Sequence, residues 1–315
     1  MGTKSNKAAG RRLSLPAESL LVQTKQLLRC FDLRARKGLG QHFLIDREVL
    51  ELIVSTAELT PADVVMEIGP GLGVLTRELA EQSGRVISIE LDDKLAAILK
   101  QSLTSFENVS VVNEDILKID PETLLREQRA GFPSGITDPF SYKVVANLPY
   151  YITSPVLRHF LEASLKPKAM VLMVQKEVAE AIAAEPGRMS VLSISVQFYG
   201  KPGVVDYVPA RCFYPAPKVD SAILRIDLYP EPIVTVADEN GFFGLVRAGF
   251  TAPRKQICNS LAQGLGMPRV EVLSLLEKSG IVSRRRAETL TLDEWAKLWH
   301  IFSREKENAD TSSAG

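Results

Sequence analysis

The sequence predicts an α/β fold with a mostly parallel, doubly wound sheet, followed by a small all-α domain. Short apolar segments rich in β-branched residues alternate with helical patterns through the first two thirds of the chain, which is typical of a parallel sheet covered by helices. After Pro230-Glu231-Pro232 the pattern changes to helices only. A length of 315 residues with 45% hydrophobic side chains is sufficient for two domains with a sizeable core.

Four segments are predicted along the chain. They are a basic, flexible extension, the α/β domain, the helical domain and a disordered tail, over residues 1–18, 19–233, 234–304 and 305–315. Residues 1–40 hold nine Lys or Arg residues against two acidic ones, a charge excess suited to a phosphate backbone. A solvated tail and an organelle transit peptide are alternative interpretations of this basic start.

Membrane and metal functions are disfavoured by composition. No apolar run approaches the length of a membrane span, and the N-terminus lacks the apolar core of a signal peptide. The three cysteines, Cys30, Cys212 and Cys258, are far apart and show no metal-ligand spacing. We therefore expect reduced thiols, a cytoplasmic location, no metal site and no membrane partner.

Strands and helices are expected in a regular order. Five buried strands come first, at 64–68, 85–89, 109–112, 143–146 and 169–174. Helices are expected at 16–30, directly after the cap residue Asp46, at 74–83 and at 92–103. Two further strands are expected at 192–198 and 221–228, and the helices of the last domain at 240–252, 254–264, 268–278 and 292–302.

The first strand runs into a glycine-rich loop, Gly69-Pro70-Gly71-Leu72-Gly73. Such a turn between a strand and a helix lets the backbone approach a nucleoside-bearing ligand. The nicotinamide-dinucleotide fingerprint would need its last glycine at the position of Val74, and Pro70 makes a diphosphate cradle less natural. The loop therefore indicates a nucleoside cofactor without identifying it.

Acidic side chains follow the next two strands at the points where they end. Glu90, 21 residues beyond Gly69, can accept hydrogen bonds from both hydroxyls of a ribose. Asp115 can accept from the amine of an adenine, with Leu91 or Ile116 packed against the ring. Each acid alone is equally well interpreted as a helix cap or a solvated side chain. Beside the glycine loop, the pair fits S-adenosylmethionine, which carries a ribose and an adenine but no phosphate.

The fourth strand ends in Asn147-Leu148-Pro149-Tyr150. Pro149 fixes its own φ and favours an extended Leu148. The oxygens of Asn147 and Leu148 can therefore point in only a limited range of directions. Two acceptors beside the flat ring of Tyr150 suit a planar base with an exocyclic amine. A strand-end turn closed by a tyrosine is the alternative, and these four residues alone do not decide between the two.

Several motifs occur in a fixed order along the chain: Gly40-Gln41-His42-Phe43-Leu44, the glycine loop with Glu67 and Ile68 before it, Glu90, Asp115, the Asn147 stretch and Phe213-Tyr214-Pro215-Ala216-Pro217-Lys218-Val219. Their order and spacing resemble those of the ribosomal RNA adenine N6,N6-dimethyltransferases, and the chain resembles the KsgA type of this family from about residue 20 to residue 303. His42 departs from the family's usual loop, which has Asn at this position, but both side chains can hydrogen-bond.

The resemblance implies a Rossmann-like methyltransferase domain and a set of site residues. The cofactor pocket is expected to contain His42, Leu44, Gly69, Gly71, Glu90, Leu91, Asp115, Ile116 and Asn147. The catalytic set is expected to be Asn147, Leu148, Pro149, Tyr150 and Phe213, with the target adenine held between Tyr150 and Phe213. Core packing between strands is the alternative for Phe213. The helical domain is expected to grip RNA through Arg247, Arg254, Lys255, Lys278 and the run Arg284-Arg285-Arg286.

The resemblance also implies an activity. A monomer would transfer methyl groups from S-adenosylmethionine, without a metal, to N6 of two adjacent adenosines near the 3′ end of small-subunit rRNA, within immature small subunits. A large-subunit rRNA adenine methylase of the antibiotic-resistance kind is a close alternative, because its pocket chemistry is the same. An RNA-binding assembly factor with secondary catalysis is another, and Val74 disfavours a nicotinamide dehydrogenase.

Overall fold

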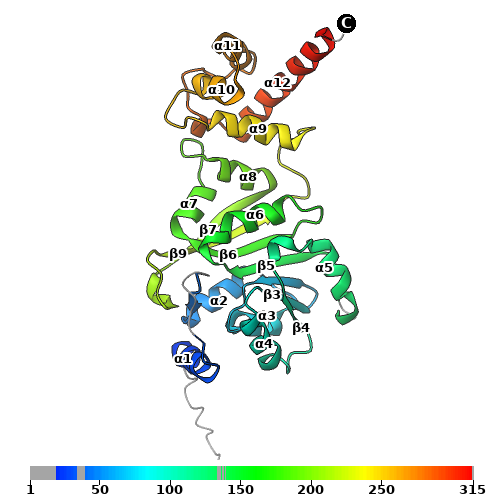
Figure 1. Ribbon diagram of the computed structural model, residues 1–315, viewed down its shortest axis with the longest axis vertical. Coiled ribbons are helices and arrows are strands. Elements are labelled where there is room, and N and C mark those ends of the chain that lie inside the picture. The colour runs from blue at the N-terminus through cyan, green and yellow to red at the C-terminus, as the bar shows by residue number, and fades with distance from the viewer. Residues whose placement is uncertain (1–18, 34–39, 133–135, 137, 139, 314–315) are drawn as a thin grey trace, which may run out of the picture.

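The computed structural model describes residues 19–33, 40–132, 136, 138 and 140–313. Its centre is a seven-stranded sheet with the order β4-β3-β2-β5-β6-β9-β7 (Figure 1). The first five strands in this order are parallel, and β9 pairs antiparallel with both β6 and β7. This confirms the predicted mostly parallel sheet. The strands are β2 (Val64–Ile68), β3 (Arg85–Glu90), β4 (Val109–Asn113), β5 (Tyr142–Asn147), β6 (Ala169–Gln175), β7 (Gly200–Val208) and β9 (Ser221–Leu228).

Helices cover both faces of the sheet, as in other doubly wound folds. On β2, Val64 and Met66 belong to one hydrophobic cluster and Val65 belongs to another. Helices α5 and α6 contribute to the first cluster, and α2 and α3 contribute to the second. The helices of this domain are α2 (Arg47–Thr56), α3 (Val74–Gln82), α4 (Asp93–Ser102), α5 (Pro121–Gln128), α6 (Thr153–Leu161), α7 (Lys176–Ile182) and α8 (Val191–Tyr199).

One predicted strand is wrong, because residues 192–198 lie within α8. This helix begins at a capping box, in which the Ser193 amide donates to the Ser190 hydroxyl at 3.1 Å and the Ser190 amide donates to the Ser193 hydroxyl at 2.7 Å. Residues 192–198 alternate apolar and polar side chains, which is the period of a strand, but the N-terminal cap favours a helix, in which even the polar Ser193 is buried. The unpredicted strand β7 begins at the next residue, Gly200.

The last four helices form the predicted all-α domain at one end of the molecule (Figure 1). Trp295 is fully buried there, and a Cβ atom added to Gly249 would lie 2.3 Å from its ring, so the close approach requires glycine. The helices are α9 (Glu239–Gly249), α10 (Ile257–Leu265), α11 (Arg269–Lys278) and α12 (Leu292–Ser313). Helix α12 continues to Ser313, and disorder of the tail over residues 305–315 stays a prediction. The predicted extension over residues 1–18 lies outside the described part of the chain.

The basic side chains of the helical domain divide into two groups. Arg285 pairs with Glu294, Lys278 pairs with Glu305, and Arg286 pairs with Glu288 at 3.7 Å. These three cations have acidic partners within the protein and are therefore less available to RNA than predicted. The exposed members of the predicted set that form no ion pair within the described residues are Arg247, Arg254, Lys255 and Arg284. None of the described helices is both long and apolar enough to cross a membrane.

A short antiparallel ribbon joins two motifs that are distant in the sequence. It consists of β1 (Phe43–Leu44) and β8 (Phe213–Tyr214), with Phe43 opposite Tyr214 and Leu44 opposite Phe213. Helix α1 (Leu20–Cys30) lies beside this ribbon, because its Leu28 shares a hydrophobic cluster with Phe43. In Figure 1, α1 lies at the end of the molecule opposite the helical domain.

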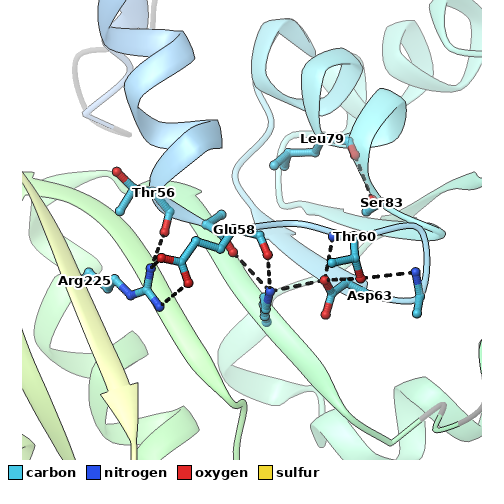
Figure 2. A network of polar contacts seen from close by, with 10 residues as sticks. Thr56, Glu58, Thr60, Asp63, Leu79, Ser83 and Arg225 are labelled. Atoms are coloured by element: carbon cyan, nitrogen blue, oxygen red, sulfur yellow. Dashed lines mark hydrogen bonds and ion pairs between the residues drawn. The ribbon is translucent and has the colours of Figure 1, made fainter.

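A polar network holds the end of α2 against the sheet (Figure 2). The Arg225 guanidinium, on β9, donates to the Thr56 carbonyl at 2.7 Å and to the Glu58 carboxylate at 2.9 Å. The Lys143 ammonium, on β5, donates to the Glu58 carbonyl at 2.8 Å and pairs with Asp63 at 3.2 Å. Cations thus satisfy carbonyls at the C-terminal end of the helix, where the helix backbone itself provides no donor.

Replacing Lys143 with methionine should lower the free energy of unfolding by about 2–3 kcal/mol. The substitution keeps the apolar stem but leaves the carbonyls of Ala57 and Glu58 and the carboxylate of Asp63 without this donor. Chemical denaturation measures the difference, and Lys100→Met, at an exposed position, is the matched control. Equal stability of the Lys143 variant and the wild type would show that the network contributes little.

Candidate active site

One cavity lies at the carboxyl ends of the parallel strands, where doubly wound sheets bind their ligands. It brings together all but one of the predicted site residues. Its wall contains His42, Leu44, Gly69, Gly71, Glu90, Leu91, Asp115, Ile116, Asn147, Leu148, Pro149 and Tyr150. Phe213 is the exception.

The glycine loop and Glu90 form one side of the cavity. Gly69 and Gly71 have φ angles of 65° and 59°, which glycine adopts without strain. The Gly71 amide donates to Oε2 of Glu90 at 3.1 Å, and the Asp92 amide donates to Oε1 at 2.9 Å. Burial raises the pKa of Glu90, although these amide donors oppose the rise. The carboxylate is therefore fixed in place, with lone pairs left for two hydroxyl groups.

Asp115 lies at another part of the wall, before the short helix η2 (Ile116–Lys118). Its Oδ1 accepts from the Leu117 amide at 3.0 Å, while Oδ2 accepts no hydrogen bond from the described residues. Ile116 is buried, whereas Leu91 is 51% exposed and thus available to a ligand. This arrangement suits a flat ring that carries an amine.

The loop that contains His42 orients the side chain of Asn147. Nδ2 of Asn147 donates to the His42 carbonyl at 3.2 Å, so Oδ1 is the atom left to accept from a ligand. The Leu148 amide donates to the Met173 carbonyl of β6 at 3.2 Å. No group of the described chain donates to the Leu148 carbonyl. Two successive residues at the end of β5 therefore each offer one free acceptor oxygen.

His42 and Tyr150 form the aromatic part of the wall. Nδ1 of His42 lies 2.7 Å from the Pro215 carbonyl, and since a carbonyl only accepts, Nδ1 carries a proton. The ring centroids of His42 and Tyr150 are 5.9 Å apart, with 25° between the planes. The Tyr150 hydroxyl bonds to the Ser221 hydroxyl at 2.7 Å, and burial raises the Tyr150 pKa. The departure from the family's usual Asn thus places a second ring beside Tyr150.

The structure does not bring Phe213 into the cavity wall. Only 3% of its surface is exposed, and its hydrophobic cluster includes Val171, Met173 and Ile223. Successive residues of a strand point to opposite faces, so Phe213 points into the core while Tyr214 points outward. In this structure Phe213 therefore packs in the hydrophobic core, as the alternative interpretation of its role expects. Stacking of Phe213 on an adenine stays a prediction.

Glu67 lines the cavity although it is not among the predicted site residues. It is 1% exposed, and its Oε2 accepts from the hydroxyls of Thr76 at 2.6 Å and Ser88 at 2.8 Å. Oε1 is buried without a hydrogen-bond partner. Burial raises the pKa of Glu67 to about 7, against the effect of the two hydroxyl donors. The sequence does contain a signal for Glu67, since it is an acidic residue within an otherwise apolar, buried strand. Burying a charged group without a partner costs free energy, so such a residue often has a function.

Glu67→Gln should remove a pH-dependent loss of stability. The folded-state pKa of about 7 lies above the ordinary value of 4.5, so the contribution of Glu67 to stability is complete below pH 4.5 and is lost as the pH rises through 7. At about 1.4 kcal/mol per pH unit, the stability of the variant relative to the wild type should rise by about 3 kcal/mol across this window. Urea unfolding of both proteins at several pH values measures this difference in stability. A difference that stays constant with pH would show that Glu67 does not have a raised pKa in the folded protein.

The chemistry of the cavity suits S-adenosylmethionine. No lysine or arginine of the described chain is among the lining residues, whereas Glu67, Glu90, Glu114 and Asp115 are. Such a wall favours a cationic ligand and disfavours a polyphosphate. Within the described residues, no group of three or more His, Cys, Asp or Glu side chains could hold a metal ion.

The fold and this cavity define the class of S-adenosylmethionine-dependent methyltransferases. A family model described as ribosomal RNA adenine dimethylase matches residues 32–303. The chain belongs to this family of rRNA adenine dimethyltransferases.

Individual relatives agree with this assignment. The chain is 50% identical over 282 residues to the ribosomal RNA small subunit methyltransferase A of Dehalococcoides mccartyi, which covers 90% of this chain and 93% of the relative. It is 42% identical over 279 residues to the protein of the same name from Alkaliphilus metalliredigens, covering 88% and 94%.

Two solved structures of similar proteins cover most of the chain. A dimethyladenosine transferase from Plasmodium falciparum has a TM-score of 0.70 and 25% identity, covering 84% of this chain and 98% of that one. The 23S rRNA methyltransferase ErmE has a TM-score of 0.64 and 32% identity, covering 83% and 99%.

Proposed function

We propose that this protein transfers methyl groups from S-adenosylmethionine to the N6 atoms of two adjacent adenosines near the 3′ end of small-subunit rRNA, in immature small subunits. The observation that carries the chemistry is the pair of free acceptor oxygens on Asn147 and Leu148 beside the Tyr150 ring. The 50% identity to a protein named for the small subunit supports the choice of RNA. The proposed enzyme is a cytoplasmic monomer, and its three free cysteines fit that compartment.

The protein's own residues supply binding and alignment. S-adenosylmethionine, when bound, supplies an electrophilic methyl group. Glu90 accepts from the ribose hydroxyls, and Asp115 accepts from the adenine amine of the cofactor, with Leu91 and Ile116 beside that ring. The target adenine lies against Tyr150, which offers an accessible face, whereas Phe213 becomes a second wall only if its ring leaves the core.

The two free oxygens solve the main chemical difficulty. An adenine amine is a poor nucleophile because its lone pair is delocalised into the ring. When its N–H bonds donate to Oδ1 of Asn147 and to the Leu148 carbonyl, the lone pair turns towards the methyl group. The same oxygens stabilise the positive charge that develops on nitrogen in the transition state. After the first transfer the nitrogen releases one of its two protons to solvent, so a single N–H remains and one oxygen still aligns the amine for the second transfer.

Labelled methyl transfer to purified ribosomal subunits tests the proposal. Immature small subunits and large subunits, both lacking dimethyladenosine, are incubated separately with the protein and labelled S-adenosylmethionine. We expect label in small-subunit rRNA. Label confined to large-subunit rRNA would reject the proposed substrate.

The alternative substrate has a specific observation in its favour. ErmE, named as a 23S rRNA methyltransferase, is 32% identical to the chain and similar in structure. A large-subunit methylase would use the same pocket chemistry, so the cavity does not separate the two. The higher identity to the small-subunit relatives favours the main proposal.

A further inference from the structure

A groove separates α1 from the turn after β8, next to the active-site cavity. Lys25 and Arg29 line it from α1, and Tyr214 and Pro215 line it from the other side. The Pro215 carbonyl accepts the hydrogen bond from Nδ1 of His42 at 2.7 Å, and His42 belongs to the cavity wall. The groove and the cavity therefore lie next to each other, and the hydrogen bond between Pro215 and His42 connects their walls.

Tyr214 faces outward because of its position in the β1–β8 ribbon. Side chains directly opposite one another in an antiparallel pair lie on the same face. Tyr214 is opposite Phe43, and Phe43 lines the cavity. Phe43 and Tyr214 thus lie on one face of the ribbon, the face that meets Leu28 of α1, and Tyr214 is 36% exposed there.

The groove combines this ring with positive charge. Nζ of Lys25 lies 5.2 Å from the centroid of the Tyr214 ring, and Arg29 follows one turn later on α1, exposed to solvent. Neither cation forms an ion pair within the described residues. Asp32 is the one acidic residue among those described in the groove lining, so two cations face one acid. A flat π-face beside cations is the arrangement that binds a single-stranded nucleotide.

We infer that this groove holds the nucleotide next to the target adenosine, with its base on Tyr214 and its phosphates on Lys25 and Arg29. The inference rests on the proposed function, in which two adjacent adenosines are modified, so that one lies just outside the cavity while the other reacts. Stacking and phosphate contacts hold a strand without reading its sequence. The groove therefore positions the second adenosine while the first is methylated.

Tyr214→Ala tests the stacking contact. We expect the dissociation constant for unmethylated small-subunit rRNA to rise about tenfold, as for the loss of one stacked base. The dissociation constant for S-adenosylmethionine should change less than about twofold, because Tyr214 is outside the cavity wall. Tyr214→Phe keeps the ring and should bind RNA like the wild type, which separates stacking from loss of the hydroxyl group.

The double variant Lys25→Gln, Arg29→Gln tests the phosphate contacts. Each contact to a single strand contributes about 0.7 to the slope of log K against log salt concentration, so the slope should become shallower by about 1.4. The double variant Lys100→Gln, Arg129→Gln, at two exposed positions with no role in the groove, should keep the wild-type slope.

The outcomes distinguish this inference from the proposed function. Wild-type RNA affinity in Tyr214→Ala, together with an unchanged slope in the Lys25 and Arg29 variant, would overturn the groove inference even if the wild type methylates small-subunit rRNA. Equal weakening of RNA and S-adenosylmethionine binding by Tyr214→Ala would overturn the groove inference as well. Such a result would mean that the substitution disturbs the cavity rather than a stacking contact in the groove. A wild type that transfers no methyl group to this RNA would reject the proposed function instead.

Discussion

Asn147→Ala should lower the saturated rate of methyl transfer to small-subunit rRNA by a factor of at least about 100, as for other groups that act on charge in the transition state. The variant loses Oδ1, one of the two oxygens that align the amine. It also loses the Nδ2 donor to the His42 carbonyl. The measurement is a single-turnover rate at saturating S-adenosylmethionine and RNA, so that weaker binding does not contribute.

Asn147→Asp is the matched control for this result. It keeps an acceptor oxygen of the same reach but cannot donate to the His42 carbonyl, so its rate should fall between those of the alanine variant and the wild type. Thermal unfolding of both variants checks that the fold is intact. If the saturated rate of Asn147→Ala lies within about fivefold of the wild-type rate, Asn147 does not align the amine for methyl transfer.

Glu90→Ala should weaken S-adenosylmethionine binding by a factor of at least about 100 and change RNA binding little. Each hydrogen bond to a charged acceptor contributes about 1.5–3 kcal/mol, and Glu90 is placed to accept from two ribose hydroxyls. The substitution also releases the amides of Gly71 and Asp92, which loosens the glycine loop. Calorimetric titration with S-adenosylmethionine and a separate RNA binding assay measure the two affinities.

The specificity of the Glu90 effect decides its interpretation. Glu107→Ala, at an exposed acid outside the cavity, should bind both ligands like the wild type. If Glu90→Ala weakens RNA and cofactor binding by the same factor, the carboxylate supports the fold of the site rather than a ribose contact.

The sheet and most of the cavity were predictable because their signals are local. A buried strand such as Val64–Ile68 is a short apolar run, and the glycine loop follows it directly. Parallel strands bring their carboxyl ends to one edge, so Glu90, Asp115 and Asn147 could be expected to meet there. The strand predicted at 192–198 is wrong although its local signal is clear: apolar and polar residues alternate there as in a strand, yet the segment folds as helix α8.

The parts that depend on distant pairing were not predictable. Whether Phe213 or Tyr214 points outward depends on the register of β8 against β1, and no local pattern encodes that register. The proton on Nδ1 of His42 depends on the Pro215 carbonyl, far along the chain. The raised pKa of Glu67 depends on its burial beneath the loop, which only the folded structure defines.

Mass spectrometry of rRNA treated with the protein tests whether Asn147 aligns N6 of the target adenosines for methyl transfer. Immature small subunits are incubated with S-adenosylmethionine and with the wild type or Asn147→Ala, and the digested RNA is searched for methylated adenosines. We expect N6,N6-dimethyladenosine at two adjacent positions near the 3′ end with the wild type, and its near absence with the variant. Dimethyladenosine formed equally by both proteins, or methylation at another atom of the base, would contradict this expectation.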